Sequence, residues 1–292
     1  MAKFFGTGVA MVTPFNADKS VDFESLGKLV DYLTNGGVEF LVVLGTTGEA
    51  ATLSTEERHK VVRYVIEKNA GKLPVVVGVG GNNTEEVLHT LKTFDLSGVD
   101  AILSVTPYYN KPNQRGLYEH YKAIALESKL PIILYNVPGR TGINMTAETT
   151  VKLAKEFKNI IGIKEASANL TQMTYILRDK PADFIVLSGD DGLALPQMAI
   201  GMDGVISVAG NCLPREFSDM VRYSIAGDMA KARPLHNKFV EIIDALFADG
   251  NPAGAKAALS YRKVVKNELR LPLVPVNDAL QKKIEQLMGE FK

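Results

Sequence analysis

The chain has 292 residues, of which 46% are hydrophobic, and its 33 basic side chains balance its 33 acidic ones. This composition indicates a folded globular protein and excludes a disordered chain. Because the charges balance, no overall field favours nucleic acid or an anionic membrane surface, and we expect neither as a partner.

A single cysteine, Cys212, makes an intrachain disulfide impossible and argues against a cysteine-based metal site. The first residues lack the long apolar run of a secretory signal. The longest apolar runs, such as 40–44 and 75–77, have the length of strands and are too short to span a bilayer. We therefore expect a soluble, cytoplasmic protein.

Short apolar runs rich in β-branched residues alternate with amphipathic helical patterns along most of the chain. The runs lack the apolar and polar alternation of half-exposed strands, which indicates parallel strands buried on both faces. A capping box at Ser54–Glu57 is typical of the helix starts between them. The predicted strands are 7–12, 40–44, 75–79, 101–104, 132–135, 160–165, 184–188 and 204–208.

Eight strand–helix units in succession predict a (β/α)8 TIM barrel, with an open doubly wound sheet as the alternative. Three helical patterns then follow without strands, at 229–248, 253–267 and 278–291. We therefore predict a catalytic barrel over residues 1–228. The C-terminal three-helix appendage over residues 229–292 is expected to pack on the barrel or to form oligomer contacts.

Lys164 closes the sixth apolar run, and barrel enzymes place their active sites at the C-terminal ends of strands. Side chains alternate along a strand, so Lys164 shares a face with Gly162 and not with Glu165. If that face is the lumen, Gly162 opens space beneath an amine held in an apolar setting. Desolvation favours the neutral amine, which attacks carbonyl groups. A lysine that reaches solvent or pairs with a carboxylate is the alternative.

Polar residues also follow other predicted strands. The turn Gly45–Glu49 has two hydroxyls and flanking glycines, which allow backbone N–H groups to approach a small carboxylate. Tyr135 shares a strand face with Ile133, so it can point inward and donate or accept a proton. The guanidinium group of Arg140 can bind a carboxylate through two N–H groups. Taken one at a time, these features are equally well explained as a tight strand-to-helix turn, an aromatic rim and an arginine on a surface loop.

Two further motifs argue against a cofactor. The adjacent acids of Ser188–Asp191 suggest a metal, but no histidine falls at ligand spacing, so we expect no metal site. The segment Gly78–Gly81 lacks the third glycine of a dinucleotide-binding fingerprint.

Five segments occur in the order and spacing of motifs of the 4-hydroxy-tetrahydrodipicolinate synthase family, also called dihydrodipicolinate synthases, which the chain resembles from about residue 4 to its end. The resemblance implies a lyase of diaminopimelate and lysine biosynthesis that condenses pyruvate with L-aspartate 4-semialdehyde through a lysine Schiff base, without a metal or dissociable cofactor. The segments are Gly45–Glu49, Thr106–Asn110, Tyr135–Gly142, Gly162–Ala166 and Ser188–Asp191.

The resemblance also implies a role for each matching residue. Lys164 would form an imine with the C2 carbon of pyruvate. Tyr135 would be the general acid and base, relaying protons through the Thr46 hydroxyl and Tyr109. Thr46 and Thr47 would hold the pyruvate carboxylate.

Further matches concern the second substrate and the assembly. Arg140 would bind the carboxylate of the semialdehyde, and the carbonyl groups of Gly189 and Ile206 would line the same pocket. In the family Tyr109 reaches in from a neighbouring subunit, which implies a homo-oligomer, usually a tetramer built as a dimer of dimers.

A possible allosteric lysine site resembles that of the family at Ala51, Asn82, Glu86 and Tyr108. Arg58 stands where lysine-sensitive members often carry a histidine. Its fixed positive charge repels a cationic ligand unless Glu86 neutralises it, so we expect weak or absent lysine inhibition.

The nearest rival is another pyruvate-dependent Schiff-base aldolase, such as N-acetylneuraminate lyase or a keto-deoxy-sugar acid aldolase. Arg140 followed by Thr141–Gly142 favours the dipicolinate branch. A barrel that has lost catalysis and acts as a binding protein would lack some of the family's catalytic residues, whereas Lys164, Tyr135 and Thr46 are all present.

Overall fold

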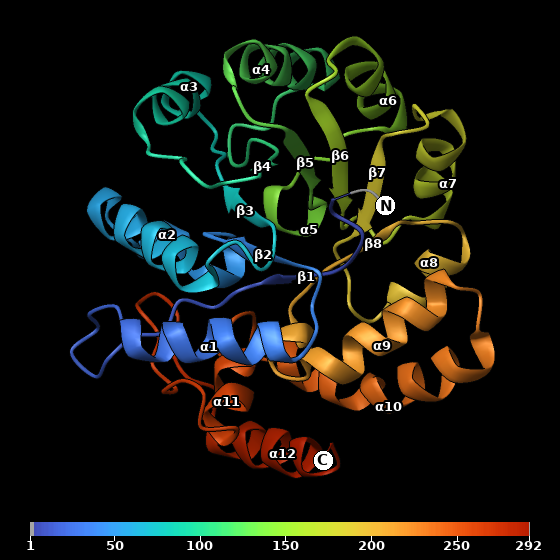
Figure 1. Ribbon diagram of the computed structural model, residues 1–292. Coiled ribbons are helices and arrows are strands. Elements are labelled where there is room, and N and C mark those ends of the chain that lie inside the picture. Colours follow the sequence, from blue (N-terminus) through green and yellow to red (C-terminus); the bar gives the residue numbers. More distant parts are fainter. Residues whose placement is uncertain (1–2, 292) are drawn as a thin grey trace.

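The computed structural model describes residues 3–291 and contains a closed barrel of eight parallel strands in chain order, with β8 hydrogen-bonded to β1. This confirms the predicted (β/α)8 fold, and Figure 1 shows the helices surrounding the strands. The strands are β1 (Gly6–Ala10), β2 (Phe40–Val43), β3 (Val75–Gly78), β4 (Ala101–Val105), β5 (Ile132–Asn136), β6 (Ile160–Glu165), β7 (Ile185–Ser188) and β8 (Gly204–Ser207).

The helices between the strands bury one apolar face each. In α2, for example, Val61, Val62 and Val65 are buried, and the predicted capping box forms in both directions between Ser54 and Glu57. The outer helices are α1 (Phe23–Asn35), α2 (Thr55–Asn69), α3 (Thr84–Thr93), α4 (Gln114–Glu127), α6 (Ala147–Glu156), α7 (Leu170–Asp179), α8 (Ala194–Ala199) and α9 (Pro214–Ile225). The one-turn helix α5 (Pro138–Thr141) follows β5 and lies over the end of the barrel (Figure 1).

A separate apolar cluster fills the lumen of the barrel. Phe4, which precedes β1, packs edge-on against Phe40 of β2 with ring centroids 5.6 Å apart. Val42, Ile133 and Leu187 belong to the same cluster. Buried side chains therefore fill the interior, as expected for a barrel of this size.

Three helices follow the barrel: α10 (Met229–Phe247), α11 (Ala253–Tyr261) and α12 (Asp278–Gly289). Helix α10 packs against α8 and α9, and α12 packs against α10 and α11 (Figure 1). The helix predicted over 253–267 is shorter than expected, because the chain leaves the helix after Tyr261 and Lys263 takes a left-handed φ of 59°. The division into a barrel and a separate C-terminal region stays a prediction.

Within residues 3–291, none of the helices combines the length and the apolar character that crossing a membrane requires.

Candidate active site

A cavity of about 740 Å³ lies where several strands end, and Lys164 of β6 is part of its wall. The turn after β2, the end of β5 and the loop after β7 also contribute, so four of the five strand ends singled out in the sequence meet here. The predicted site residues in the wall are Thr46, Thr47, Tyr135, Arg140, Lys164 and Gly189.

Lys164 lies inside the barrel with only 6% of its surface exposed. Strand register places it beside Tyr135 of β5, and its Nζ lies 4.3 Å from the centre of the Tyr135 ring. No ion pair joins Lys164 to a carboxylate anywhere in residues 3–291. The amine is therefore buried, adjacent to a phenol and open to a cavity large enough for a small keto acid.

Glu165, the next residue, faces away from the lumen as the strand alternation predicts. Its carboxylate accepts hydrogen bonds from Asn136 Nδ2 at 3.0 Å, Gln172 Nε2 at 3.0 Å and the Ser167 backbone N–H at 2.7 Å. Sequence reasoning did not identify this network. These hydrogen bonds hold the Glu165 carboxylate on the outer side of the barrel, away from Lys164, and they fix the end of β6.

The prediction that Gly162 opens space beneath Lys164 is wrong. A side-chain carbon at position 162 would overlap Ile185, whose side chain from β7 already fills that space. The glycine is required for packing between neighbouring strands and leaves no room for substrate.

Gly189 leaves space for the Lys164 side chain because it has no side chain of its own. A Cβ at this position would lie 2.6 Å from the Ala166 Cβ and 3.1 Å from the Lys164 Cε. The first distance is a clash with a side chain that cannot rotate away, so a methyl group here displaces the strand end that carries the amine.

We therefore expect Gly189→Ala to lower kcat/KM about a hundredfold, because a shift of about 1 Å at a reacting group has an effect of that size. Overpacking should also reduce the free energy of unfolding by about 1–3 kcal/mol. Steady-state kinetics and thermal unfolding measure the two effects. Gly289→Ala is the control, since a Cβ there meets only the Tyr261 hydroxyl at 3.5 Å. Unchanged kcat/KM in Gly189→Ala would contradict this account of the site.

The hydroxyls of the predicted carboxylate-binding turn lie on a short 3-10 helix, Thr46–Gly48. Thr46 is exposed to the cavity, whereas Thr47 is 2% exposed and its Oγ1 accepts a hydrogen bond of 2.9 Å from Asn251 Nδ2. Since a hydroxyl both donates and accepts, Thr47 keeps its proton available for a ligand.

Tyr109 and Arg140 differ in their relation to the cavity. Arg140, in the one-turn helix α5, lines it. Tyr109 is 90% exposed, has a left-handed φ of 70° and is not part of the cavity wall. The described residues of this chain therefore bring Lys164, Tyr135 and Thr46 together, but they do not bring Tyr109, the remaining member of the expected proton relay, to the same cavity.

Residues 3–290 match the model of the dihydrodipicolinate synthetase family. The chain belongs to this family. It is 56% identical over 286 residues to the 4-hydroxy-tetrahydrodipicolinate synthase of Parabacteroides distasonis, an alignment that covers 98% of this chain and 96% of that protein.

Solved structures of dihydrodipicolinate synthases have the same fold. One, described as the first monomeric variant, is 41% identical with a TM-score of 0.96, covering 99% of this chain and 97% of that one. Another, from Cyanidioschyzon merolae with lysine bound, is 40% identical with a TM-score of 0.95, covering 99% of this chain and 98% of that one.

In this family member Asp191, one of the two adjacent acids after β7, has a structural explanation. Asp191 accepts hydrogen bonds from the backbone N–H groups of Val208 at 3.0 Å and Ala209 at 2.7 Å. Burial raises the pKa of the Asp191 carboxyl. No group of three metal-binding side chains occurs in the part of the chain that the structure describes. Asp191 thus holds the loop after β8 in place.

Ile206 belongs to the lumen cluster and is not among the residues of the cavity wall, and the expectation that its carbonyl lines the pocket stays a prediction. The outer wall comes from a region where no site residue was predicted. Helix α10 and the segment after it provide Ile243, Asp244, Phe247, Ala248 and Asn251. Nothing in the helical pattern of this region indicates which strand ends it covers, so sequence reasoning missed it.

The predicted lysine-site residues are only partly brought together. Ala51, Arg58 and Tyr108 line a second cavity of about 420 Å³ that shares Thr46 and Tyr135 with the first, whereas Asn82 and Glu86 are not part of its wall. Arg58 Nε donates to the Ala50 carbonyl at 3.1 Å. Weak lysine inhibition stays a prediction.

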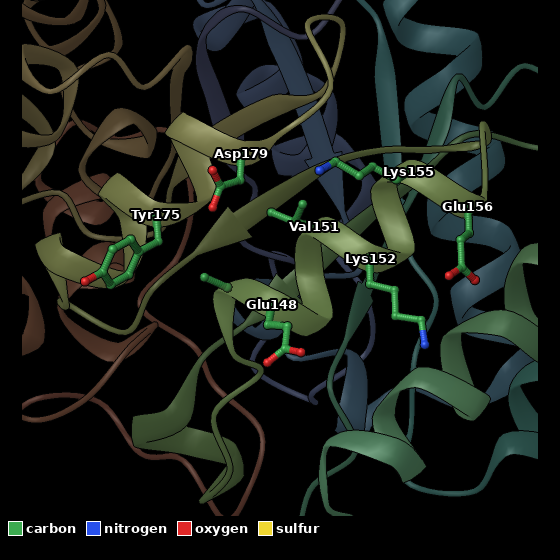
Figure 2. Close-up of a pocket in the computed structure, with 8 residues that line it drawn as sticks. Glu148, Val151, Lys152, Lys155, Glu156, Tyr175 and Asp179 are labelled. Atoms are coloured by element: carbon green, nitrogen blue, oxygen red, sulfur yellow. The ribbon is translucent and has the colours of Figure 1, made fainter.

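A third hollow lies on the outer surface between α6 and α7. Figure 2 shows its charged side chains, including Glu148, Lys152 and Asp179, arranged along the two helices. It contains none of the predicted site residues.

Proposed function

We propose that this chain condenses pyruvate with L-aspartate 4-semialdehyde and that Lys164 carries the covalent intermediate. The observation that supports this most strongly is the buried Lys164 amine, which opens to the cavity beside Tyr135 and has no carboxylate partner in residues 3–291. Membership of the dihydrodipicolinate synthetase family supports the same reaction.

In the first half-reaction the Lys164 amine adds to the C2 carbonyl of pyruvate, and loss of water gives the imine. Loss of a proton from C3 then gives the enamine. Tyr135, whose ring lies beside the amine, is proposed to move these protons as general acid and base. Thr46 and Thr47 hold the pyruvate carboxylate through hydroxyl and backbone N–H groups.

In the second half-reaction the enamine carbon attacks the aldehyde and forms the new carbon–carbon bond. The substrate's own amine then adds to the imine carbon, which closes the ring and releases Lys164. Arg140 is proposed to bind the semialdehyde carboxylate through paired N–H groups. Gly189 leaves room for the reacting lysine, and its carbonyl is proposed to face the substrates. The scheme needs no metal or dissociable cofactor, because the lysine imine itself accepts the electron pair.

Borohydride reduction in the presence of pyruvate, followed by mass mapping, tests the covalent step. We expect a reduced pyruvyl adduct on Lys164. Turnover with L-aspartate 4-semialdehyde, and none with N-acetylneuraminate, distinguishes the proposed reaction from that of a related aldolase.

We also propose that the active form is a homo-oligomer, a tetramer built as a dimer of dimers, in which Tyr109 completes the proton relay of a neighbouring subunit. The 90% exposure of this large aromatic side chain supports the proposal, as does the fact that it forms no part of the cavity wall in its own subunit.

Mixing two inactive variants tests this arrangement. Tyr109→Ala removes the donated side chain and Lys164→Ala removes the nucleophile, so a mixed dimer contains one site with both residues intact. We expect refolded mixtures to regain up to about a quarter of wild-type activity, since half of the random dimers are mixed and each has one working site of two. Mixtures that stay inactive would show that Tyr109 acts within its own subunit, and a Tyr109→Ala variant that is active by itself would show that it has no catalytic role.

A further inference from the structure

The turn after β2 is held from the C-terminal region by a buried ion pair. Glu49 ends this turn with a left-handed φ of 52°. Its Oε1 lies 2.5 Å from the Lys256 Nζ, and both side chains are 0% exposed. Its other oxygen accepts a hydrogen bond of 3.1 Å from the Arg270 backbone N–H. Both carboxylate oxygens of Glu49 are thus bound by groups beyond residue 250.

Lys256 depends on Glu49 in turn. The lysine, on α11, also donates to the Glu268 carbonyl at 2.7 Å and lies 4.2 Å from the centre of the Phe15 ring. Desolvation lowers the pKa of Lys256 to about 8, while the Glu49 carboxylate raises it. Removing either partner leaves a charge buried without compensation, so the two side chains act as one unit.

A second contact reaches the same turn from the same region. Asn251 Nδ2 donates to the Thr47 Oγ1 at 2.9 Å. From the barrel side, the Thr13 hydroxyl donates to the Gly48 carbonyl at 2.6 Å. Positions 47, 48 and 49 are therefore each fixed by a hydrogen bond from outside the turn, and Thr46 directly precedes them.

We propose that Asn251 and Lys256 are positioning residues that hold the Thr46–Thr47 turn in the geometry that binds the pyruvate carboxylate. The inference rests on the proposed function, because it assumes that this turn binds pyruvate. It assigns the C-terminal region a role in substrate affinity in addition to its packing on the barrel.

An ion pair that only stabilises the fold and an ion pair that positions the turn are distinguished by the effect of their loss on the KM for pyruvate. If Lys256 only stabilises the fold, its loss lowers the unfolding temperature and leaves the KM values of the surviving enzyme alone. If it positions the turn, its loss raises the KM for pyruvate, while the KM for the semialdehyde, proposed to bind through Arg140, stays the same.

The main test is the paired variant Glu49→Gln with Lys256→Met, which removes both charges and keeps the side-chain sizes similar. We expect the KM for pyruvate to rise about tenfold to a hundredfold, as for other small misplacements of binding groups, and the KM for the semialdehyde to change less than twofold. Borohydride trapping on Lys164 should need correspondingly more pyruvate. Unchanged pyruvate affinity in this variant would overturn the inference.

Ile284→Ala is the matched control for stability alone, because Ile284 is fully buried on α12, away from the turn. It should lower the unfolding temperature without changing the KM for pyruvate. A rise in that KM equal to the rise in the paired variant would show that general destabilisation is the cause, and the inference would fail.

Asn251 provides an independent test if the paired variant does not fold. Because Asn251 acts through the Thr47 hydroxyl, Asn251→Ala should raise the KM for pyruvate in the wild-type background and change it little in a Thr47→Val background. Equal effects in both backgrounds, or none in either, would overturn the role of Asn251. If the wild-type enzyme is not trapped on Lys164, the proposed function fails; if it is trapped and the variants bind pyruvate normally, only the positioning role fails.

Discussion

Replacing Lys164 with alanine should lower kcat/KM by about 10⁴-fold or more while the barrel stays folded. The loss is large because covalent catalysis has no substitute once its nucleophile is removed. The fold should survive because Lys164 makes no ion pair within residues 3–291, so its removal leaves no buried charge without a partner. We expect the free energy of unfolding to change by about 1 kcal/mol or less.

Lys164→Arg is the control for this experiment. Arginine keeps the charge and most of the side-chain volume but stays protonated, so it forms no imine with a keto acid. Activity should be lost in both variants, and circular dichroism with thermal unfolding should show both folded. A folded Lys164→Ala protein that turns over substrate at the wild-type rate would contradict the mechanism.

Replacing Tyr135 with phenylalanine should lower kcat by about 10²- to 10⁴-fold, the range expected for the loss of a general acid and base. The ring, which is 7% exposed and lies over the Lys164 amine, stays in place, so packing should change little. Rapid-quench measurements should show slower imine formation, and prolonged incubation with pyruvate and borohydride should still label Lys164.

Tyr121→Phe is the matched control for the loss of a buried hydroxyl. Tyr121 is fully buried on α4, and its hydroxyl donates to the Ser104 carbonyl at 2.9 Å, outside the cavity wall. That variant should lose stability but not catalytic rate. A Tyr135→Phe enzyme with wild-type kcat would show that another group moves the protons.

The barrel and the position of Lys164 inside it were predictable because both depend on local patterns. Strands that are covered by helices on one face and by lumen side chains on the other are apolar throughout, and the runs at 40–44 and 75–79 have this composition. The alternation of side chains along a strand places Lys164 and Glu165 on opposite faces, as the structure confirms.

Features that depend on neighbouring strands were not predictable in the same way. The space next to Gly162 is filled by Ile185 because of the register between β6 and β7, which no pattern within β6 specifies. The clash that makes Gly189 necessary likewise involves Ala166 and Lys164, which lie on a different strand end.

The contribution of the C-terminal region was missed for a related reason. An amphipathic pattern shows that α10 buries one face, but not that Phe247 and Asn251 reach the wall of the cavity. Lys256 looks like an ordinary helical lysine in the sequence. Only the fold shows that it is fully buried against Glu49, more than 200 positions earlier in the chain.

The proposed mechanism depends on one step, in which the Lys164 amine, without an ion-pair partner in residues 3–291, forms a carbon–nitrogen bond with pyruvate in the mouth of the barrel. Borohydride reduction of the wild-type enzyme with pyruvate, followed by peptide mass mapping, measures this bond directly. We expect one reduced pyruvyl group per chain, on Lys164, and complete loss of activity as it forms. An enzyme that remains unlabelled and active, or that carries the label on another lysine, would contradict the proposed mechanism.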